Sequence, residues 1–168
     1  DVRLSTDGRW LLVHASLGWD RTDVHLQDRR SGAWTTVIEG VDALTSLRVV
    51  GDRLVGTTTL DAPTGRVVTA PLDAPTPDRW TDLVPAGPDV VEAVVATSGS
   101  LLVASTRAAV SSVHRVALPP AGADHPPPTP LVEADRVALP SDGSLTALTG
   151  SDDRDEAFLG FTSFAQPP

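Results

Sequence analysis

Short apolar runs alternate with clusters of glycine, proline, aspartate and serine along the whole chain. The runs are rich in valine, leucine and threonine, and they have the length of strands, about four to eight residues. No segment keeps the period of an amphipathic helix for more than a few residues. We therefore predict an all-β protein, with turns at the polar clusters.

The predicted strands recur in a fixed order. In each repeat a first strand precedes a tight turn, and the second strand is marked by Leu11, Leu54 and Leu101, which lie 43 and 47 residues apart. A third strand follows, and then a fourth, for which we take WTTVIEG, WTDLVPA and TPLVEA. Four antiparallel strands in about 40 to 50 residues are typical of a β-propeller blade. The sequence therefore predicts blades at about residues 2–40, 41–88 and 89–135, and a half-blade at 144–164.

The predicted half-blade leaves strand edges without partners. The proline-rich stretch PPAGADHPPPTP cannot join a ladder, so we expect a loop insertion there. The chain starts at Asp1 and stops at FAQPP, which is typical of a piece of a longer protein. Open edges need cover, either from more chain or from a second copy in a homodimer. The apolar residues expected at the two open ends are Val2, Leu4, Phe158, Phe161 and Phe164.

Five phrases resemble a known family. LSTDGRWLLV, TTLDAPTGRVV, RWTDLVP, DVVEAVV and FLGFTSFAQPP occur in the order and spacing of the N-terminal propeller of the prolyl oligopeptidase family of serine peptidases. The resemblance is continuous over nearly the whole chain. It implies part of a seven-bladed β-propeller that caps an α/β-hydrolase catalytic domain and lets only short peptides reach a buried serine triad.

The chain carries no catalytic machinery that we recognise. The G-x-S-x-G nucleophile elbow of an α/β-hydrolase is absent from the sequence, so we assign no catalytic residue. The resemblance implies a lid and size filter of a peptidase that cleaves short peptides. One alternative remains open, a stand-alone propeller that binds other proteins. A non-peptidase enzyme propeller such as a lactonase would need a set of carboxylates and asparagines at the central tunnel, and we see no such set in the sequence.

The stretch ASLGWDRTDV, residues 15–24, is the candidate substrate-binding loop. A WD repeat is not indicated, because Trp19-Asp20 occurs once and falls between the second and third strands. In the family, the similar loop points toward the active site, and some members carry an arginine and a cysteine where this chain has Ser16 and Trp19. Trp19 can stack on a peptide, with Asp20 or Arg21 fixing a terminus by charge. Alternatively, Trp19 packs over the blade edge.

Charge and composition exclude several classes of protein. The net charge is −9 and all 13 basic residues are arginine, so nucleic acid is not an expected partner. No apolar run is long enough to span a membrane, and the start lacks a signal-peptide pattern. The chain has no cysteine, which fits the cytoplasm, our expected location, and equally a cysteine-poor secreted protein.

We predict no metal and no cofactor. The acidic stretch SDDRDE, residues 151–156, lacks the glycine and the distal glutamate of a calcium loop and is interpreted as a hairpin turn. The four histidines form no metal-binding pair; they are His14, His25, His114 and His125. The stretch Asp61-Ala62-Pro63 is interpreted as a structural turn.

Overall fold

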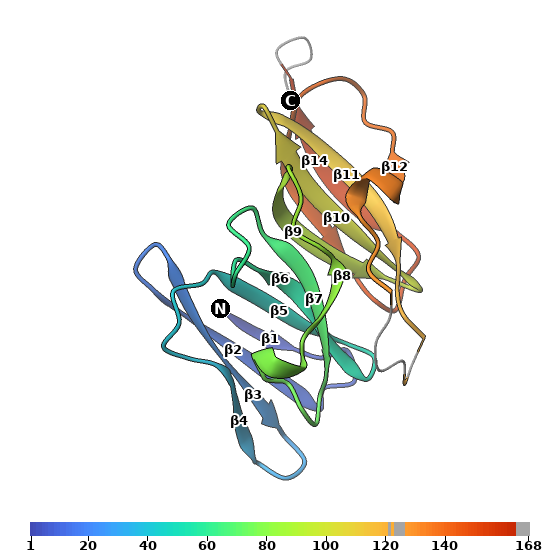
Figure 1. Cartoon of the computed structure of the whole chain (residues 1–168). Helices are drawn as coiled ribbons and strands as arrows, with labels where there is room; N and C mark the ends of the chain where they lie inside the picture. Colours follow the sequence, from blue (N-terminus) through green and yellow to red (C-terminus); the bar gives the residue numbers. More distant parts are fainter. Residues whose placement is uncertain (121, 123–126, 164–168) are drawn as a thin grey trace.

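The computed structural model describes residues 1–120, 122 and 127–163 of the chain (Figure 1). In this described part, fourteen β-strands and two single turns of 3-10 helix are present, and no α-helix. The strands form three four-stranded antiparallel sheets and one two-stranded sheet, each a meander in chain order. The predicted all-β class is confirmed.

The sheets follow one another along the chain. The first contains β1 (Val2–Leu4), β2 (Trp10–Leu17), β3 (Arg21–Asp28) and β4 (Trp34–Ile38). The second contains β5 (Thr45–Val50), β6 (Arg53–Thr58), β7 (Arg66–Pro71) and β8 (Thr81–Val84). The third contains β9 (Val90–Thr97), β10 (Ser100–Arg107), β11 (Val110–Ala117) and β12 (Asp135–Val137). The last pairs β13 (Ser144–Gly150) with β14 (Ala157–Thr162), and the 3-10 turns are η1 (Pro77–Arg79) and η2 (Leu131–Glu133).

Two apolar cores lie between successive sheets. One joins the first and second sheets, and its fully buried residues include Leu12, Leu26, Leu47 and Leu54. The other joins the second and third sheets around Val55, Val67, Leu101 and Val103. Side chains on both faces of the middle strands β6 and β10 are buried, which explains why neither strand alternates strictly between apolar and polar residues.

The predicted fourth strand of the third sheet is wrong. TPLVEA, residues 129–134, contains η2, and the ladder resumes only at β12, where Val137 pairs with Val113. Pro130 has no N–H to give to a ladder. The N–H of Thr129 donates instead to the carbonyl of Leu83 in β8 (2.8 Å), and Leu131 packs against the core between the second and third sheets. The segment is thus held against the preceding sheet.

The first strands of all four sheets surround a common cavity. Residues of β1, β5, β9 and β13 line this space of about 340 Å³. An up-and-down meander with its first strand innermost, repeated around an axis, is the architecture of a β-propeller. We call this space the axial cavity; its lining residues are Arg3, Leu4, Thr6, Arg48, Val49, Val50, Ala96, Gly150, Ser151 and Asp152. In the described part of the chain, no helix is long and apolar enough to cross a membrane.

Candidate functional site

The predicted substrate-binding residues gather at one tight loop. Gly18, Trp19 and Asp20 join β2 to β3, and Gly18 takes the positive φ (72°) that the turn requires. Trp19 is 97% exposed, so its indole packs on no neighbour within the described chain, and the alternative that it covers the blade edge is wrong. Asp20 and Ser16 are exposed beside it. The loop therefore presents an uncovered aromatic surface to solvent.

Arg21 is held in place by an ion pair. Its Nε and one terminal nitrogen donate to the two carboxylate oxygens of Asp23, both at 2.9 Å. Asp23 is buried and also accepts a hydrogen bond from the N–H of Gly40 (3.0 Å). The Arg21 guanidinium lowers the pKa of Asp23, and the Asp23 carboxylate raises the pKa of Arg21. Because Arg21 is already engaged, Trp19 and Asp20 are the better placed residues to meet a ligand.

A groove rich in hydroxyl groups lies next to the loop and was missed by sequence reasoning. Its volume is about 240 Å³, and threonines from three neighbouring segments line it. The hydroxyls of Thr45 and Thr58 are 3.0 Å apart, and the Oγ1 of Thr59 accepts from the N–H of Leu44 (2.8 Å). Hydroxyls fixed in this way can bond the backbone of an extended peptide. The lining residues are Thr22, Leu44, Thr45, Ser46, Thr57, Thr58, Thr59, Gly65, Val91 and Glu92.

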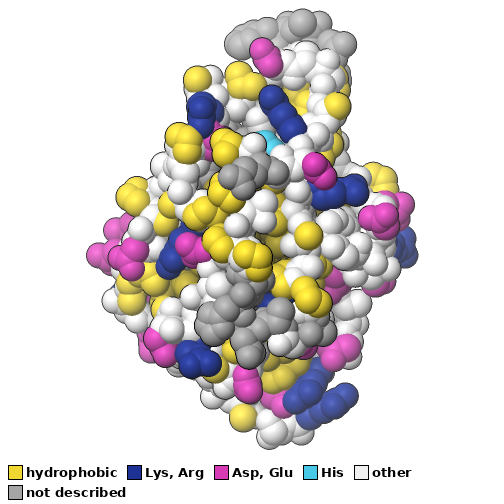
Figure 2. Space-filling view, turned by 45° about the vertical axis from the view of Figure 1, so that its right-hand side comes forward, with side chains coloured by type: hydrophobic (Ala, Val, Ile, Leu, Met, Phe, Trp, Pro, Cys, Tyr) yellow, Lys and Arg dark blue, Asp and Glu magenta, His cyan; other side chains and the backbone are white. Residues whose placement is uncertain are grey.

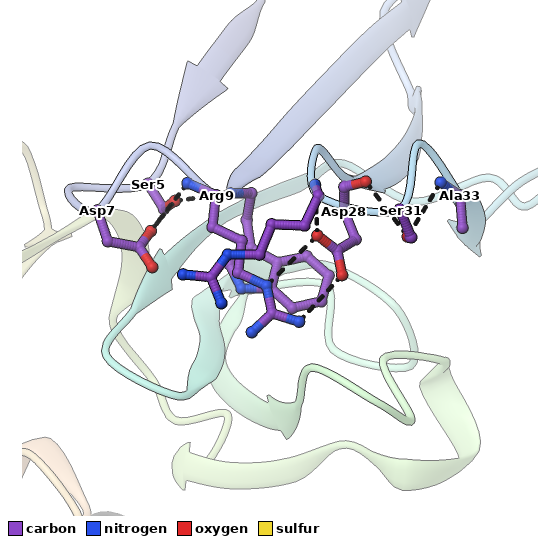
Figure 3. Close-up of polar contacts among 8 residues, drawn as sticks. Ser5, Asp7, Arg9, Asp28, Ser31 and Ala33 are labelled. Atoms are coloured by element: carbon purple, nitrogen blue, oxygen red, sulfur yellow. Dashed lines mark hydrogen bonds and ion pairs between the residues drawn. The ribbon is translucent and has the colours of Figure 1, made fainter.

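The family-like DGR phrase is structural (Figure 3). The hydroxyl of Ser5 donates to Asp7 (2.6 Å), which also accepts from the N–H of Arg9 (3.0 Å). The Arg9 side chain then pairs with Asp28 of β3 (2.9 Å), which lowers the pKa of that carboxyl. These bonds tie the β1–β2 turn to the end of β3.

The remaining candidates have structural surroundings. Residues 151–156 form the turn between β13 and β14, and the described residues contain no group of three or more side chains suited to a metal. His25 lies in β3 and His114 in β11, while His14 is buried in β2. His125 and Phe164 lie outside the described residues. The Asp61-Ala62-Pro63 turn joins β6 to β7, and Asp61 has a positive φ of 53°.

Charged groups of both signs are mixed over the surface. On the face shown in Figure 2, arginine and acidic side chains lie around hydrophobic side chains, without one continuous basic area. This mixed distribution does not form the continuous basic surface that binds the phosphates of a nucleic acid on that face.

The stacked four-stranded sheets around an axis define the class as a β-propeller. The model of the prolyl oligopeptidase N-terminal β-propeller domain matches residues 1–168. The chain belongs to this family.

Solved structures share this fold. The chain is 28% identical, with a TM-score of 0.83, to a structure from a study of two prolyl endopeptidases that concerns inter-domain dynamics in catalysis and specificity. It is 17% identical to prolyl oligopeptidase B from Galerina marginata (TM-score 0.75) and 19% identical to oligopeptidase B from Trypanosoma brucei (TM-score 0.69). Of the present chain, the three alignments cover 99%, 99% and 87%. No curated protein matches the sequence significantly.

The chain spans only part of these structures. It covers 23%, 23% and 21% of their respective lengths.

Proposed function

We propose that this chain is the lid and size-filter part of a prolyl-oligopeptidase-like serine peptidase that acts on short peptides. The single observation that carries the proposal is the axial cavity, enclosed by the first strands of all four sheets in a chain that matches the family's propeller from end to end. A narrow passage along such an axis admits an extended chain and rejects a folded protein. We propose the cytoplasm as its compartment.

The partner in this proposal is an α/β-hydrolase catalytic domain of the same protein. Covering a serine triad excludes bulk water, which strengthens the electrostatic interactions that stabilise the transition state. The chain's own sequence lacks the G-x-S-x-G elbow, so the nucleophile must come from that domain.

Trp19 is the proposed substrate contact. Its indole is almost fully exposed on a loop whose flanking strands are firmly paired, from Leu17 with Arg21 to Trp10 with Asp28. An exposed indole gains by stacking on a prolyl ring or another apolar side chain. The hydroxyl groove beside the loop adds hydrogen bonds to the peptide backbone.

The test uses the full-length protein that carries this chain. It should cleave a short chromogenic prolyl peptide, and it should leave a folded protein that contains the same bond uncut. Trp19→Ala should raise KM for the short peptide about five-fold or more and change kcat little, because the indole binds without touching the reacting atoms. Trp34→Ala is the matched control, since Trp34 is exposed on the outer strand β4.

Equal cleavage of the folded protein would contradict the size filter. An unchanged KM in Trp19→Ala would contradict the assigned contact. If the full-length protein cleaves no peptide but binds other proteins, the result would instead favour a propeller that serves as a protein-interaction module.

A further inference from the structure

The axial cavity has an electrostatic character of its own. Its volume of about 340 Å³ falls within the range of ligand pockets, about 300 to 1,000 Å³. Arg3 and Arg48 line it together with one carboxylate, that of Asp152. The cavity lining is therefore cationic, although the whole chain has a net charge of −9.

Arg48 interrupts the inner strand of the second sheet. It lies in β5 between Leu47 and Val49, which are both buried, and its side chain is directed to the cavity. Among the described residues its guanidinium interacts with Arg3 and Asp152 only through charge, and no hydrogen-bond acceptor contacts it. Burial and the neighbouring Arg3 both lower the pKa of Arg48. Five donor groups in a half-buried site thus lack an acceptor from the described protein.

Arg3 brings a second guanidinium to the same space. One of its terminal nitrogens donates to the carbonyl of Leu47 (3.2 Å), which fixes the side chain next to β5. Its Nε pairs with the exposed Asp1 carboxylate at 2.7 Å. Asp152 is already a hydrogen-bond acceptor for the Thr6 hydroxyl. Two like charges therefore border the cavity; Arg3 has the Asp1 carboxylate as its partner, and Arg48 has only the charge of Asp152 nearby.

We propose that the axial cavity binds the carboxylate group of a peptide, held by Arg48 with Arg3 beside it. A guanidinium donates two parallel hydrogen bonds to a carboxylate, and the added negative charge relieves the repulsion between the two arginines. A monoanion fits better than a phosphate dianion, because Asp152 repels the second charge. The proposal concerns a site within this chain and stands whether or not the chain covers a catalytic domain.

The experiment measures binding to the full-length protein that carries this chain, by isothermal titration calorimetry. The probe is N-acetyl-glycylglycine, and its C-terminal amide is the uncharged counterpart. The acid should bind in a saturable way and at least ten-fold more tightly than the amide. A second pair of probes compares the two kinds of peptide carboxylate. N-acetylglutamine carries only a C-terminal carboxylate, and N-acetylglutamate α-amide carries only a side-chain carboxylate.

Variants test the assigned residues. Arg48→Gln should weaken binding of the acid at least ten-fold, whereas Arg79→Gln, a change at an exposed arginine of η1, should leave it unchanged. Asp152→Asn keeps an oxygen for the Thr6 hydroxyl and removes the competing charge, so it should strengthen binding about three-fold. This gain does not depend on how well Arg48→Gln folds. Equal binding of acid and amide, or a weaker affinity in Asp152→Asn, would overturn the proposal.

Discussion

Single residues join the first two sheets across their core. The Nε2 of His14 in β2 accepts a hydrogen bond from the N–H of Leu47 in β5 at 3.0 Å. The ring is buried, and its Nδ1 has no partner in the described part of the chain. Burial, followed by the nearby Arg3 charge, lowers the pKa of His14 to about 4. Protonation of Nε2 would also replace its acceptor with a second donor facing the Leu47 N–H.

The first prediction is that stability falls in acid because of His14. In the unfolded chain this histidine has an ordinary pKa of about 6.5, so between pH 6.5 and 4 the unfolded state binds more protons. The contribution is complete above pH 6.5 and is lost as the pH falls toward 4, on the order of 3 kcal/mol in all. Urea unfolding at several pH values measures it. His14→Gln should flatten the dependence in this window, whereas Gln27→Ala, at a partly exposed site in the next strand, should not.

Gly56 shows a second residue-scale constraint. It lies opposite Leu47 in the β5–β6 ladder, and a Cβ added there would stand 2.0 Å from the carbonyl oxygen of Ser46 and 2.7 Å from the Cα of Leu47. Both atoms belong to the backbone of β5, which cannot yield as a flexible side chain would. The close approach of the two strands therefore requires glycine.

We predict that Gly56→Ala lowers the free energy of unfolding by about 3 kcal/mol, the upper part of the usual range for overpacking a core. Chemical unfolding followed by circular dichroism measures the change. Gly87→Ala is the control, because a Cβ at Gly87 meets nothing within 4 Å and its φ is ordinary. A loss below about 1 kcal/mol in Gly56→Ala would show that β5 and β6 can separate at no great cost.

Residue spacing would have revealed part of this chemistry. Arg21 and Asp23 are two apart in one strand, so their side chains share a face and an ion pair between them can be predicted from the sequence. The contact of His14 with Leu47 cannot, because it depends on how two sheets pack. The same holds for the meeting of Arg3 with Arg48.

At the scale of elements, the sequence pattern of apolar runs and turn residues predicts the strands, but it does not predict the paths of the connections between them. Middle strands such as β6 and β10 are marked by apolar runs next to turn residues, and both appear where the pattern puts them. The failure at TPLVEA came from a tertiary contact: the Thr129 N–H is taken by β8 of the preceding sheet. Local propensity holds no information about that partner. The leucine and the valine of TPLVEA favoured a strand, so the sequence pattern alone predicted one there.

The turn between β10 and β11 is an element under strain. Ala108 and Ala109 both have positive φ, 49° and 65°, in a two-residue hairpin. This conformation suits Asn-Gly and costs an alanine about 1 kcal/mol or more. The two residues also border a cavity of about 490 Å³ between the third and fourth sheets.

Replacing the pair by Asn-Gly should therefore stabilise the chain. We expect the double substitution Ala108→Asn and Ala109→Gly to raise the free energy of unfolding by about 1 to 2 kcal/mol, because it removes the strain in the turn. Thermal or urea unfolding measures it. Ala86→Gly, in the exposed β8–β9 connection, is the control and should give no gain, since glycine alone adds freedom to the unfolded chain. No gain in the double variant would mean that the turn is relaxed.

At the scale of the whole molecule, the family and the propeller class were accessible from sequence because five phrases kept their order and spacing. The candidate loop was found in the same way. The axial cavity and the hydroxyl groove were not, since each collects residues from three or more segments far apart in the chain. A repeat predicts that inner strands meet, but the groups that face one another depend on the register and tilt of every sheet.

The isolated chain should be catalytically inactive. Acyl transfer needs an activated nucleophile and an oxyanion hole, and the sequence has no nucleophile elbow. We expect no turnover of a chromogenic prolyl peptide by the purified 168-residue chain. Activity that persists after repurification, and that disappears when one serine of the chain is changed to alanine, would contradict this expectation.

The last prediction is that the isolated chain associates through the exposed strand edges at its two ends. In the described residues β14 pairs only with β13, so its outer edge offers unpaired backbone groups, and Phe158 on it is 68% exposed. At the other end Val2 and Leu4 of β1 are 63% and 56% exposed. Burying a large apolar side chain contributes about 1.5 to 3 kcal/mol, which is considerable against a typical total stability of about 5 to 15 kcal/mol.

We expect the isolated chain to dimerise or aggregate at micromolar concentration, as measured by sedimentation. Phe158→Lys should weaken the association by placing a charge on the edge, whereas Val132→Lys, at a site on η2 that is 80% exposed, should not. A wild-type chain that sediments as a monomer and melts cooperatively would show that these edges need no cover.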